Sequence, residues 1–435
     1  MSEPGFPDGP IGSLIADQVG GGTPSRQNPV YWNGPIPWAS VKDFEDGQLE
    51  LTSTEETISQ QGLNNSATNL IPANTPIVCT RMAVGRAAVA PMDIAINQDL
   101  KALFPAKDVS TRYLLRLADF AKPLAEAVSV GSTVKGIKIA DYLNIDVPLA
   151  PTTQQSKIAE VLDTLDAAIR ETEAVVAKLK AMKQGLLHDL LTRGIDANGG
   201  LRPPHTEAPH LYKETPLGWL PKEWEVDHLA TFATVHGGKR LPAGHAYADG
   251  RTGYKYLRVT DFFGKGFQVS DLENLGERTF KALERYEITA GQLYISIAGS
   301  LGHVGVFPES SEGNVRTILT ENAARIVLTR DGCPDFFSMM MNSQAVQQQV
   351  EWEKGTGGGV PKLALFRIAQ FFVGFPNPEE QTLITQAFHQ ISRREKEETA
   401  LLDKLRLQKS GLMDDLLTGR VSVAPLLEEG AAHGA

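Results

Sequence analysis

Residues 155–192 read QSKIAEVLDTLDAAIRETEAVVAKLKAMKQGLLHDLLT, and this stretch decides how the chain is organised. It contains no proline and a single glycine, Gly185. Apolar side chains recur along it in alternating steps of four and three residues, which predicts a coiled-coil helix with one apolar seam. Such a helix is roughly 55–60 Å long at about 1.5 Å per residue, more than most globular domains bury, so it needs a partner helix.

The chain supplies this partner helix itself. Residues 381–418 read QTLITQAFHQISRREKEETALLDKLRLQKSGLMDDLLT and align with residues 155–192 without a gap. Identical pairs include Gln155/Gln381 and Lys183/Lys409. The alternative, two unrelated surface helices, does not account for shared composition as well as shared phase. We expect the following residues in the seam: Ile158, Leu162, Leu165, Leu179, Leu186, Ile384, Phe388, Leu405 and Leu412.

Lys183 and Lys409 occupy equivalent positions of this apolar seam. A polar group at such a position can fix the register of two helices at some cost in stability. The alternative is that both long side chains reach past the seam into solvent. The sequence leaves both interpretations open.

The composition is that of an ordinary globular protein, with 435 residues, of which 42% are hydrophobic and 22% charged. No apolar run approaches the ~20 residues of a membrane span. The first ten residues lack the basic and apolar regions of a secretion signal. Cys79 and Cys333 are too few for a disulfide framework or a metal cluster. We therefore expect a cytoplasmic protein without membrane contact.

The net charge of −10 counts against a simple nucleic-acid binder. Such proteins usually carry a basic surface, because neutralising phosphates supplies much of their affinity. A DNA-binding function must therefore rest on local basic patches or on a partner that contributes positive charge.

The rest of the chain divides into two loosely related globular parts. Both mix short β-type runs with glycine and proline turns, and Pro123 breaks a helical stretch at 111–128. Four pairs of segments correspond between the two parts. They are VGGG (19–22) with VHGG (235–238), VKDF (41–44) with VTDF (259–262), VGR (84–86) with LGH (301–303), and residues 129–143 with residues 355–368. The expected segments are a first domain at 11–150, a first long helix at 152–194, a linker at 195–215, a second domain at 216–376, a second long helix at 378–420 and a frayed tail at 421–435.

These segments predict a mixed α/β (α+β) fold of two globular domains, each followed by a long helix. The two helices are expected to form an antiparallel coiled coil with pseudo-two-fold symmetry. Two related domains on a rigid spacer suit two separated half-sites on a DNA duplex. Because the domains diverge, they would read different sequences.

Basic residues near turns are the candidate DNA contacts. In the first domain they are Arg26, Lys42, Arg81, Arg86, Lys135 and Lys138, and in the second Lys239, Arg240, Lys255 and Arg258. The stretch GGGTPSR at 20–26 is equally consistent with a phosphate-binding loop and with a tight turn. Asn97 and Gln98 are candidate readers of adenine, although a structural role is favoured for Asn97.

Two other classes of function compete with DNA recognition. The first is an enzyme, either a nuclease or a methyltransferase. A nuclease would use Asp93, Asp99 and Lys101, but the spacing of these residues is common. The chain also lacks a phosphate-binding loop motif and the Asp/Asn-Pro-Pro-Tyr/Phe phrase typical of amino-methyltransferases. A coiled-coil scaffold without sequence-specific DNA binding explains the helices and the acidity. It does not explain why two similar globular domains recur.

The chain resembles the specificity (S) subunit of type I restriction–modification systems over residues 11–420. The resemblance rests on PLAPTTQQSKIAEVLDTLD with KQGLLHDLLTRG, on PNPEEQTLITQAFHQI with KSGLMDDLLTGR, on PLGWLPKEW, and on the shorter phrases INQDL and GSTVKGI. The first domain departs from the family pattern because it lacks the GW-x-P-x-x-W strand that precedes the second.

This resemblance implies two non-catalytic target-recognition domains that read a bipartite, asymmetric site in double-stranded DNA. It also implies that the long helices dock two adenine-specific methyltransferase subunits, which restriction/translocase subunits join. No cofactor is expected on this chain. S-adenosylmethionine, ATP and magnesium are implied for the partner subunits.

Overall fold

The computed structural model describes residues 5–131, 134–262, 267–311, 313–354 and 362–433. Residues 355–361, half of the predicted repeat segment at 355–368, lie outside the described residues. The chain divides into two compact units, one formed by Met1–Ala174 with Thr399–Ala435 and the other by Val175–Glu398. Each unit therefore holds one globular part together with portions of both long helices.

The two long helices are α5, Thr152–Thr192, and α11, Pro378–Thr418, each of 41 residues. Within the first unit, Lys409 pairs with Asp166. Within the second unit, Lys183 pairs with Glu395 at the same distance, 2.7 Å. These half-buried pairs favour the register interpretation of the two lysines over solvent exposure.

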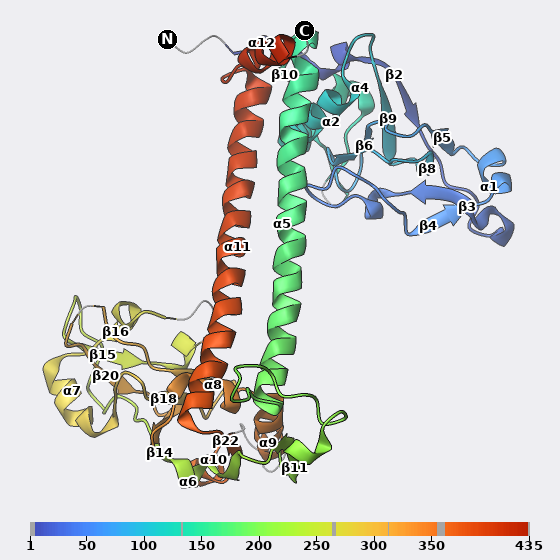
Figure 1. The fold of residues 1–435 in the computed structure, drawn as a ribbon. Helices are drawn as coiled ribbons and strands as arrows, with labels where there is room; N and C mark the ends of the chain where they lie inside the picture. The colour runs from blue at the N-terminus through green and yellow to red at the C-terminus, as the bar shows by residue number, and fades with distance from the viewer. Residues whose placement is uncertain (1–4, 132–133, 263–266, 312, 355–361, 434–435) are drawn as a thin grey trace. The chain divides into compact units, whose positions relative to one another are not determined.

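The globular part of the first unit contains two four-stranded sheets (Figure 1). The antiparallel sheet has the order β2 (Ile15–Gly20), β9 (Leu100–Pro105), β6 (Ile77–Cys79), β7 (Ala87–Ala88). The mixed sheet has the order β4 (Glu56–Ile58), β3 (Trp32–Ala39), β8 (Ile94–Ile96), β5 (Asn69–Ile71), with β3 and β8 parallel. Residues of both sheets, among them Ile77 and Ile96, form one buried core cluster.

The second unit repeats this topology strand for strand. Its antiparallel sheet has the order β14 (Ala233–Gly237), β21 (Ala323–Leu328), β18 (Leu293–Ser296), β19 (Val304–Val306). Its mixed sheet has the order β16 (Glu273–Asn274), β15 (Tyr254–Leu257), β20 (Arg316–Leu319), β17 (Glu287–Ile288), with β15 and β20 parallel. The predicted duplication of the globular parts is therefore present in their strand order.

Short antiparallel strand pairs lead into the long helices. β1 (Asp8–Pro10) pairs with β10 (Asp146–Pro148) before α5, and β13 (Glu225–His228) pairs with β22 (Phe372–Phe375) before α11. The second unit has an additional hairpin, β11 (Tyr212–Thr215) with β12 (Gly218–Pro221). This hairpin contains the GW-x-P strand that the first domain lacks.

Shorter helices pack beside the strands of each unit. They are α1 (Gln60–Asn64), α2 (Thr111–Phe120), α3 (Lys122–Val128) and α4 (Ile139–Leu143) in the first unit, and α6 (Leu229–Phe232), α7 (Glu277–Leu283), α8 (Pro334–Met341), α9 (Gln344–Lys354) and α10 (Leu365–Ala369) in the second. The break between α2 and α3 at Ala121 agrees with the break predicted from Pro123.

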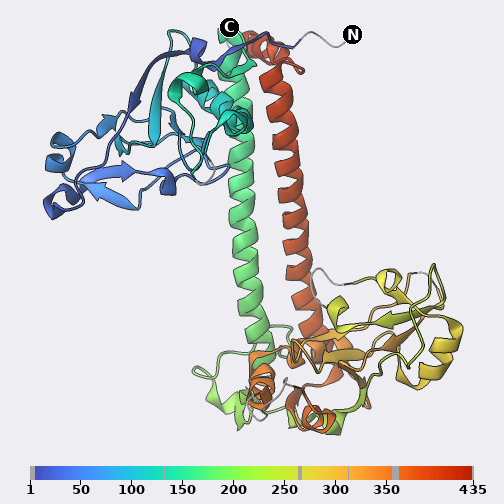
Figure 2. The same cartoon turned by 180° about the vertical axis from the view of Figure 1, so that it is seen from behind.

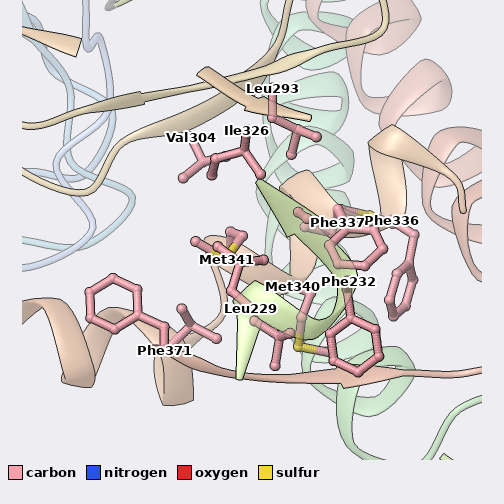
Figure 3. Packing of buried hydrophobic residues seen from close by; sticks show 14 of the residues in the cluster. Leu229, Phe232, Leu293, Val304, Ile326, Phe336, Phe337, Met340, Met341 and Phe371 are labelled. Carbon is pink, nitrogen blue, oxygen red and sulfur yellow. The ribbon is translucent and has the colours of Figure 1, made fainter. Parts of the chain in front are cut away.

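The seam side chains pack into the core of the unit in which they lie. Ile158 and Leu162 join a cluster with Tyr113 of α2 and Leu416 of α11, and α2 lies beside α5 in both views (Figures 1 and 2). In the second unit the α8 residues Phe336, Phe337 and Met340 pack around Phe232 (Figure 3), and Ile384 belongs to the same cluster. Leu179 is also buried, whereas the remaining predicted seam residues are half-buried: Leu165, Leu186, Phe388, Leu405 and Leu412.

The repeated glutamines Gln155 and Gln381 are both fully buried. Gln155 accepts the N–H of Ser110 at 3.0 Å and donates to the carbonyl of Ala150 at 3.0 Å. Gln381 likewise accepts the N–H of Cys333 at 2.8 Å and donates to the carbonyl of Pro376 at 2.8 Å. Each amide thus ties the start of its long helix to the helix α2 or α8, because buried backbone groups need partners.

One segment prediction needs correction. The tail expected to fray contains helix α12, Ala424–His433, and Val423 before it is buried against Leu416 and Leu417. The predicted linker at 195–215 also makes internal contacts, because Arg202 is 7% exposed and ion-paired. An apolar or ion-paired contact fixes each segment, and local composition does not reveal it.

Among the described residues, no helix is both long and apolar enough to cross a bilayer.

Candidate nucleic-acid interface

The glycine segment at 20–22 crosses the end of strand β8. The N–H of Gly22 donates to the carbonyl of Ile96 at 3.0 Å. A Cβ atom on Gly21 would lie 1.9 Å from that same oxygen, so a side chain is excluded there. None of the three glycines has a positive φ, so close approach of two backbones requires them rather than a tight turn.

The second unit repeats this crossing. The N–H of Lys239 donates to the carbonyl of Leu319 at 2.9 Å, and a Cβ atom on Gly238 would lie 2.0 Å from the carbonyl oxygen of Thr320. Gly238 is thus the counterpart of Gly21. The echo read from the sequence paired Val19 with Val235 and is displaced by one residue.

Arg26 lies on a pair of tryptophans beside the first crossing. Its guanidinium sits 3.9 Å from the ring centre of Trp32 and 5.4 Å from that of Trp38. Its two terminal nitrogens, Nη1 and Nη2, donate to the two carboxylate oxygens of Glu56, and the longer of these contacts is 2.8 Å. The hydrogen bond to Glu56 raises the pKa of Arg26, and the Arg26 hydrogen bond lowers the pKa of Glu56. The tryptophans also fix the loop, because the indole N–H of Trp38 donates to the carbonyl of Gly22.

Lys42 and Arg86 contact the segment that follows β3. The ammonium of Lys42 lies 3.6 Å from Glu55, and both side chains are well exposed. Arg86 donates to the carbonyl of Phe44 at 2.7 Å and lies 3.8 Å from Asp46. Arg86 therefore supports this segment, and only Lys42 presents most of its side chain to solvent.

Arg81 and Lys135 lie in two loops that contact one another. Arg81 is 3.4 Å from Asp99 and forms a backbone bridge with Gly136. Lys135 and Lys138 are exposed, and neither has an acidic partner at ion-pair distance among the described residues. Arg81, Lys135 and Lys138 thus place three positive charges in two adjoining loops.

In the second unit Lys239 and Arg240 follow strand β14. Both are exposed, and Arg240 lies 3.4 Å from Glu321. The carbonyl of Lys239 accepts the hydroxyl of Tyr256, and burial raises the pKa of that tyrosine to about 12.

The prediction that Lys255 contacts DNA is wrong. Lys255 is 3% exposed, and its ammonium donates to the carbonyls of Ser270 and Leu272 at 2.8 and 3.1 Å. Arg258 is partly exposed but donates to Asp261 and Glu273, and the hydrogen bond to Asp261 raises its pKa. The basic stretch in the sequence is thus largely committed to internal contacts.

The candidate base readers Asn97 and Gln98 differ in burial. Asn97 is 6% exposed and hydrogen-bonded to Asp99, in agreement with the structural role favoured from the sequence. Gln98 is exposed and accepts the hydroxyl of Thr23 at 2.6 Å, so it can present its amide at the first glycine crossing.

The nuclease alternative gains no support from the arrangement of its residues. Asp93 accepts the backbone N–H of Ala73, whereas Asp99 bonds to Asn97 and Arg81. Over the described ranges, no group of histidine, cysteine or carboxylate side chains is arranged to hold a metal ion.

Two charged features are not apparent from the sequence. In the second unit Glu380, at the start of α11, accepts from Arg202, from the indole of Trp224 and from the N–H of Ile195. In the first unit a charged groove of about 1090 Å³ contains buried Arg116, which pairs with Asp163 and Asp166. These contacts join residues far apart in sequence, and no local pattern marks them.

The comparisons with known proteins agree with the duplicated fold. Residues 14–181 match the sequence model of the family described as the type I restriction modification DNA specificity domain. The MjaIX specificity subunit of Methanocaldococcus jannaschii is 26% identical over 61% of this chain, and the match spans 60% of that relative's length. The putative MjaX specificity subunit of the same organism is 22% identical over 94% of this chain and 92% of the relative.

Among solved structures, the type I restriction–modification S subunit from M. genitalium superposes with a TM-score of 0.57 at 13% identity. The superposition covers 96% of this chain and 97% of the other. This likeness concerns the fold alone. Together with the sequence matches it confirms the resemblance to type I specificity subunits, and the mixed α/β fold with two globular parts and long helices.

Proposed function

We propose that this chain selects the DNA sequence on which a type I restriction–modification complex acts. Residues 11–150 and 216–376 would be two target-recognition domains that read the halves of a bipartite, asymmetric site. The observation that carries this proposal is the repetition of one strand topology in both units, with different side chains beside the equivalent glycine crossings. One scaffold with two different surfaces suits two different half-sites.

The long helices would set the distance between the half-sites and dock two methyltransferase subunits. The half-buried pairs of Lys183 with Glu395 and of Lys409 with Asp166 support a fixed register of the helix pair. Restriction/translocase subunits would join this core in the cytoplasm. S-adenosylmethionine, ATP and magnesium would belong to the partner subunits.

The proposed DNA contacts retain nine of the predicted cations, without Lys255. Three of these lysines lack an acidic partner among the described residues: Lys135, Lys138 and Lys239. The others pair with carboxylates of their own unit: Arg26, Lys42, Arg81, Arg86, Arg240 and Arg258. Because few phosphates can then be neutralised, this chain alone should bind DNA weakly. The methyltransferase subunits would supply the remaining phosphate contacts.

The test is to purify the chain with and without its methyltransferase subunits and measure methylation of genomic DNA. The complex should methylate adenine at one two-part motif, whereas either component alone should not. Assembly without any sequence preference would support the scaffold alternative. Metal-dependent cleavage of DNA by the chain alone would overturn the assignment to a non-catalytic subunit.

A further inference from the structure

The turn between β6 and β7 has the same backbone geometry as the turn between β18 and β19. In the first unit the N–H of Gly85 donates to the carbonyl of Cys79 at 2.9 Å. In the second unit the N–H of Gly302 donates to the carbonyl of Ser296 at 2.9 Å. Residues the same number of steps along the two turns are therefore equivalent.

The third residue after Cys79 is Met82, and the third after Ser296 is Gly299. Both have left-handed backbones, with φ of 63° for Met82 and 79° for Gly299. Glycine adopts this conformation without strain, whereas a residue with a long side chain is disfavoured there. The turn therefore calls for glycine in both units, and the first unit has methionine instead.

The fold does not account for this methionine side chain. Met82 is 66% exposed, so its burial does not offset the backbone strain. Its N–H donates to the carbonyl of Lys135 at 2.9 Å, a bond that glycine would form equally well. Strain at an exposed position is typical of a residue kept for an interaction.

The surroundings of Met82 are apolar and positively charged. Val130 is 71% exposed and Val134 46% exposed, and the backbone of Val130 is hydrogen-bonded to that of Gly136. Arg81 and Lys135 flank these side chains, as described above. We call the surface formed by Arg81, Met82, Val130, Val134 and Lys135 the Met82 tip.

We propose that the Met82 tip enters a groove of double-stranded DNA, where the Met82 side chain packs against bases while Arg81 and Lys135 contact phosphates. Apolar side chains flanked by cations insert between base steps in this way, and the distortion they cause depends on sequence. Met82 would thereby help to specify one half-site. This inference rests on the proposed function.

Two observations favour DNA over a methyltransferase subunit as the occupant. The first is charge: the charged side chains of the Met82 tip are the cations Arg81 and Lys135. Asp99, the carboxylate at ion-pair distance from Arg81, is buried and is therefore not part of the exposed surface. The equivalent positions in the second unit are Ala298 and Gly299, which are neutral and small. Two copies of one methyltransferase would favour similar contacts on both units, whereas two different half-sites require different ones.

The test compares Met82→Gly with Met82→Asn and Met82→Leu in the assembled complex with both methyltransferase subunits. Asparagine tolerates the left-handed backbone but is polar, whereas leucine keeps an apolar side chain. Leu70→Ala is the matched control, because Leu70 is another exposed apolar residue of the same unit, at 43% exposure. The substrates are duplexes with the motif that the wild-type complex methylates, and duplexes with single base changes in either half.

We expect Met82→Gly and Met82→Asn to assemble normally and to melt at or above the temperature of the wild type. Their methylation rate at low substrate concentration should fall roughly tenfold, with relaxed discrimination in one half-site only. Met82→Leu and Leu70→Ala should retain most of the rate. Unchanged rate and discrimination in Met82→Gly would overturn the inference, as would loss of methyltransferase assembly. A wild-type complex without any sequence preference would instead overturn the proposed function.

Discussion

Replacing Arg202 with alanine should destabilise the second unit strongly. Arg202 donates two hydrogen bonds to Glu380, the longer at 3.1 Å, and one to Glu223 at 2.7 Å. Arg202 and Glu380 are 7% and 4% exposed. Removing one partner of a buried ion pair leaves a charge without compensation, which costs about 3–5 kcal/mol. With a urea m value of about 2 kcal/mol/M, the unfolding midpoint should fall by roughly 1.5–2.5 M.

The assay is urea unfolding followed by tryptophan fluorescence, because Trp224 is fully buried and its indole donates to Glu380 at 3.0 Å. Arg330→Ala is the matched control, since Arg330 pairs with Glu225 at 2.8 Å on the surface of the same unit. An exposed pair contributes about 0–1 kcal/mol. Equal midpoints for the two variants would refute the reasoning. A double replacement of Arg202 and Glu380 by leucine should recover little of the lost stability, because it leaves the indole N–H of Trp224 and the N–H of Ile195 buried without an acceptor.

Three further predictions concern the helices and their supports. Gln155→Leu should lower the free energy of unfolding by about 1–3 kcal/mol, because it leaves the backbone N–H of Ser110, just before α2, unpaired. The neighbouring Gln154→Leu is the control. Its unfolding free energy should change little, because the Gln154 Oε1 is buried without a hydrogen-bond partner in the described structure. A double-mutant cycle replacing Lys183 and Glu395 with methionine should give a coupling energy of about 1 kcal/mol, and a value near zero would contradict the register role. Burial raises the pKa of Asp119, so the folded state binds its proton more readily and stability falls as pH rises above the unfolded pKa of about 3.9. Asp119→Asn should therefore raise the melting temperature at pH 7 but not below about pH 4; equal shifts at both pH values would contradict this.

The long helices were predictable because one gapless repeat contains both the apolar period and the identical Gln155/Gln381 pair. The division of each globular part into two sheets was not predictable, because pairs such as β3 with β8 join segments far apart in sequence. The burial of Lys255 was hidden for the same reason. Its alternation with Tyr254 and Tyr256 predicts a strand but not which face is covered, and the carbonyls that receive its ammonium come from a later loop.

Part of the candidate interface was predictable and part was not. Glycine runs and basic residues marked the two crossings and the loop with Lys135. The sequence could not show that carboxylates of the same unit pair with Arg26 and Arg81. Nor could it show that Met82 has a left-handed backbone, because nothing in the local sequence requires glycine there.

The most direct measurement is single-molecule methylation sequencing of host DNA from cells with and without this gene. The account predicts that deletion abolishes adenine methylation at one asymmetric, two-part motif, and that restoring the gene restores it. A motif that persists after deletion, or methylation at a continuous site that depends on the gene, would contradict the account.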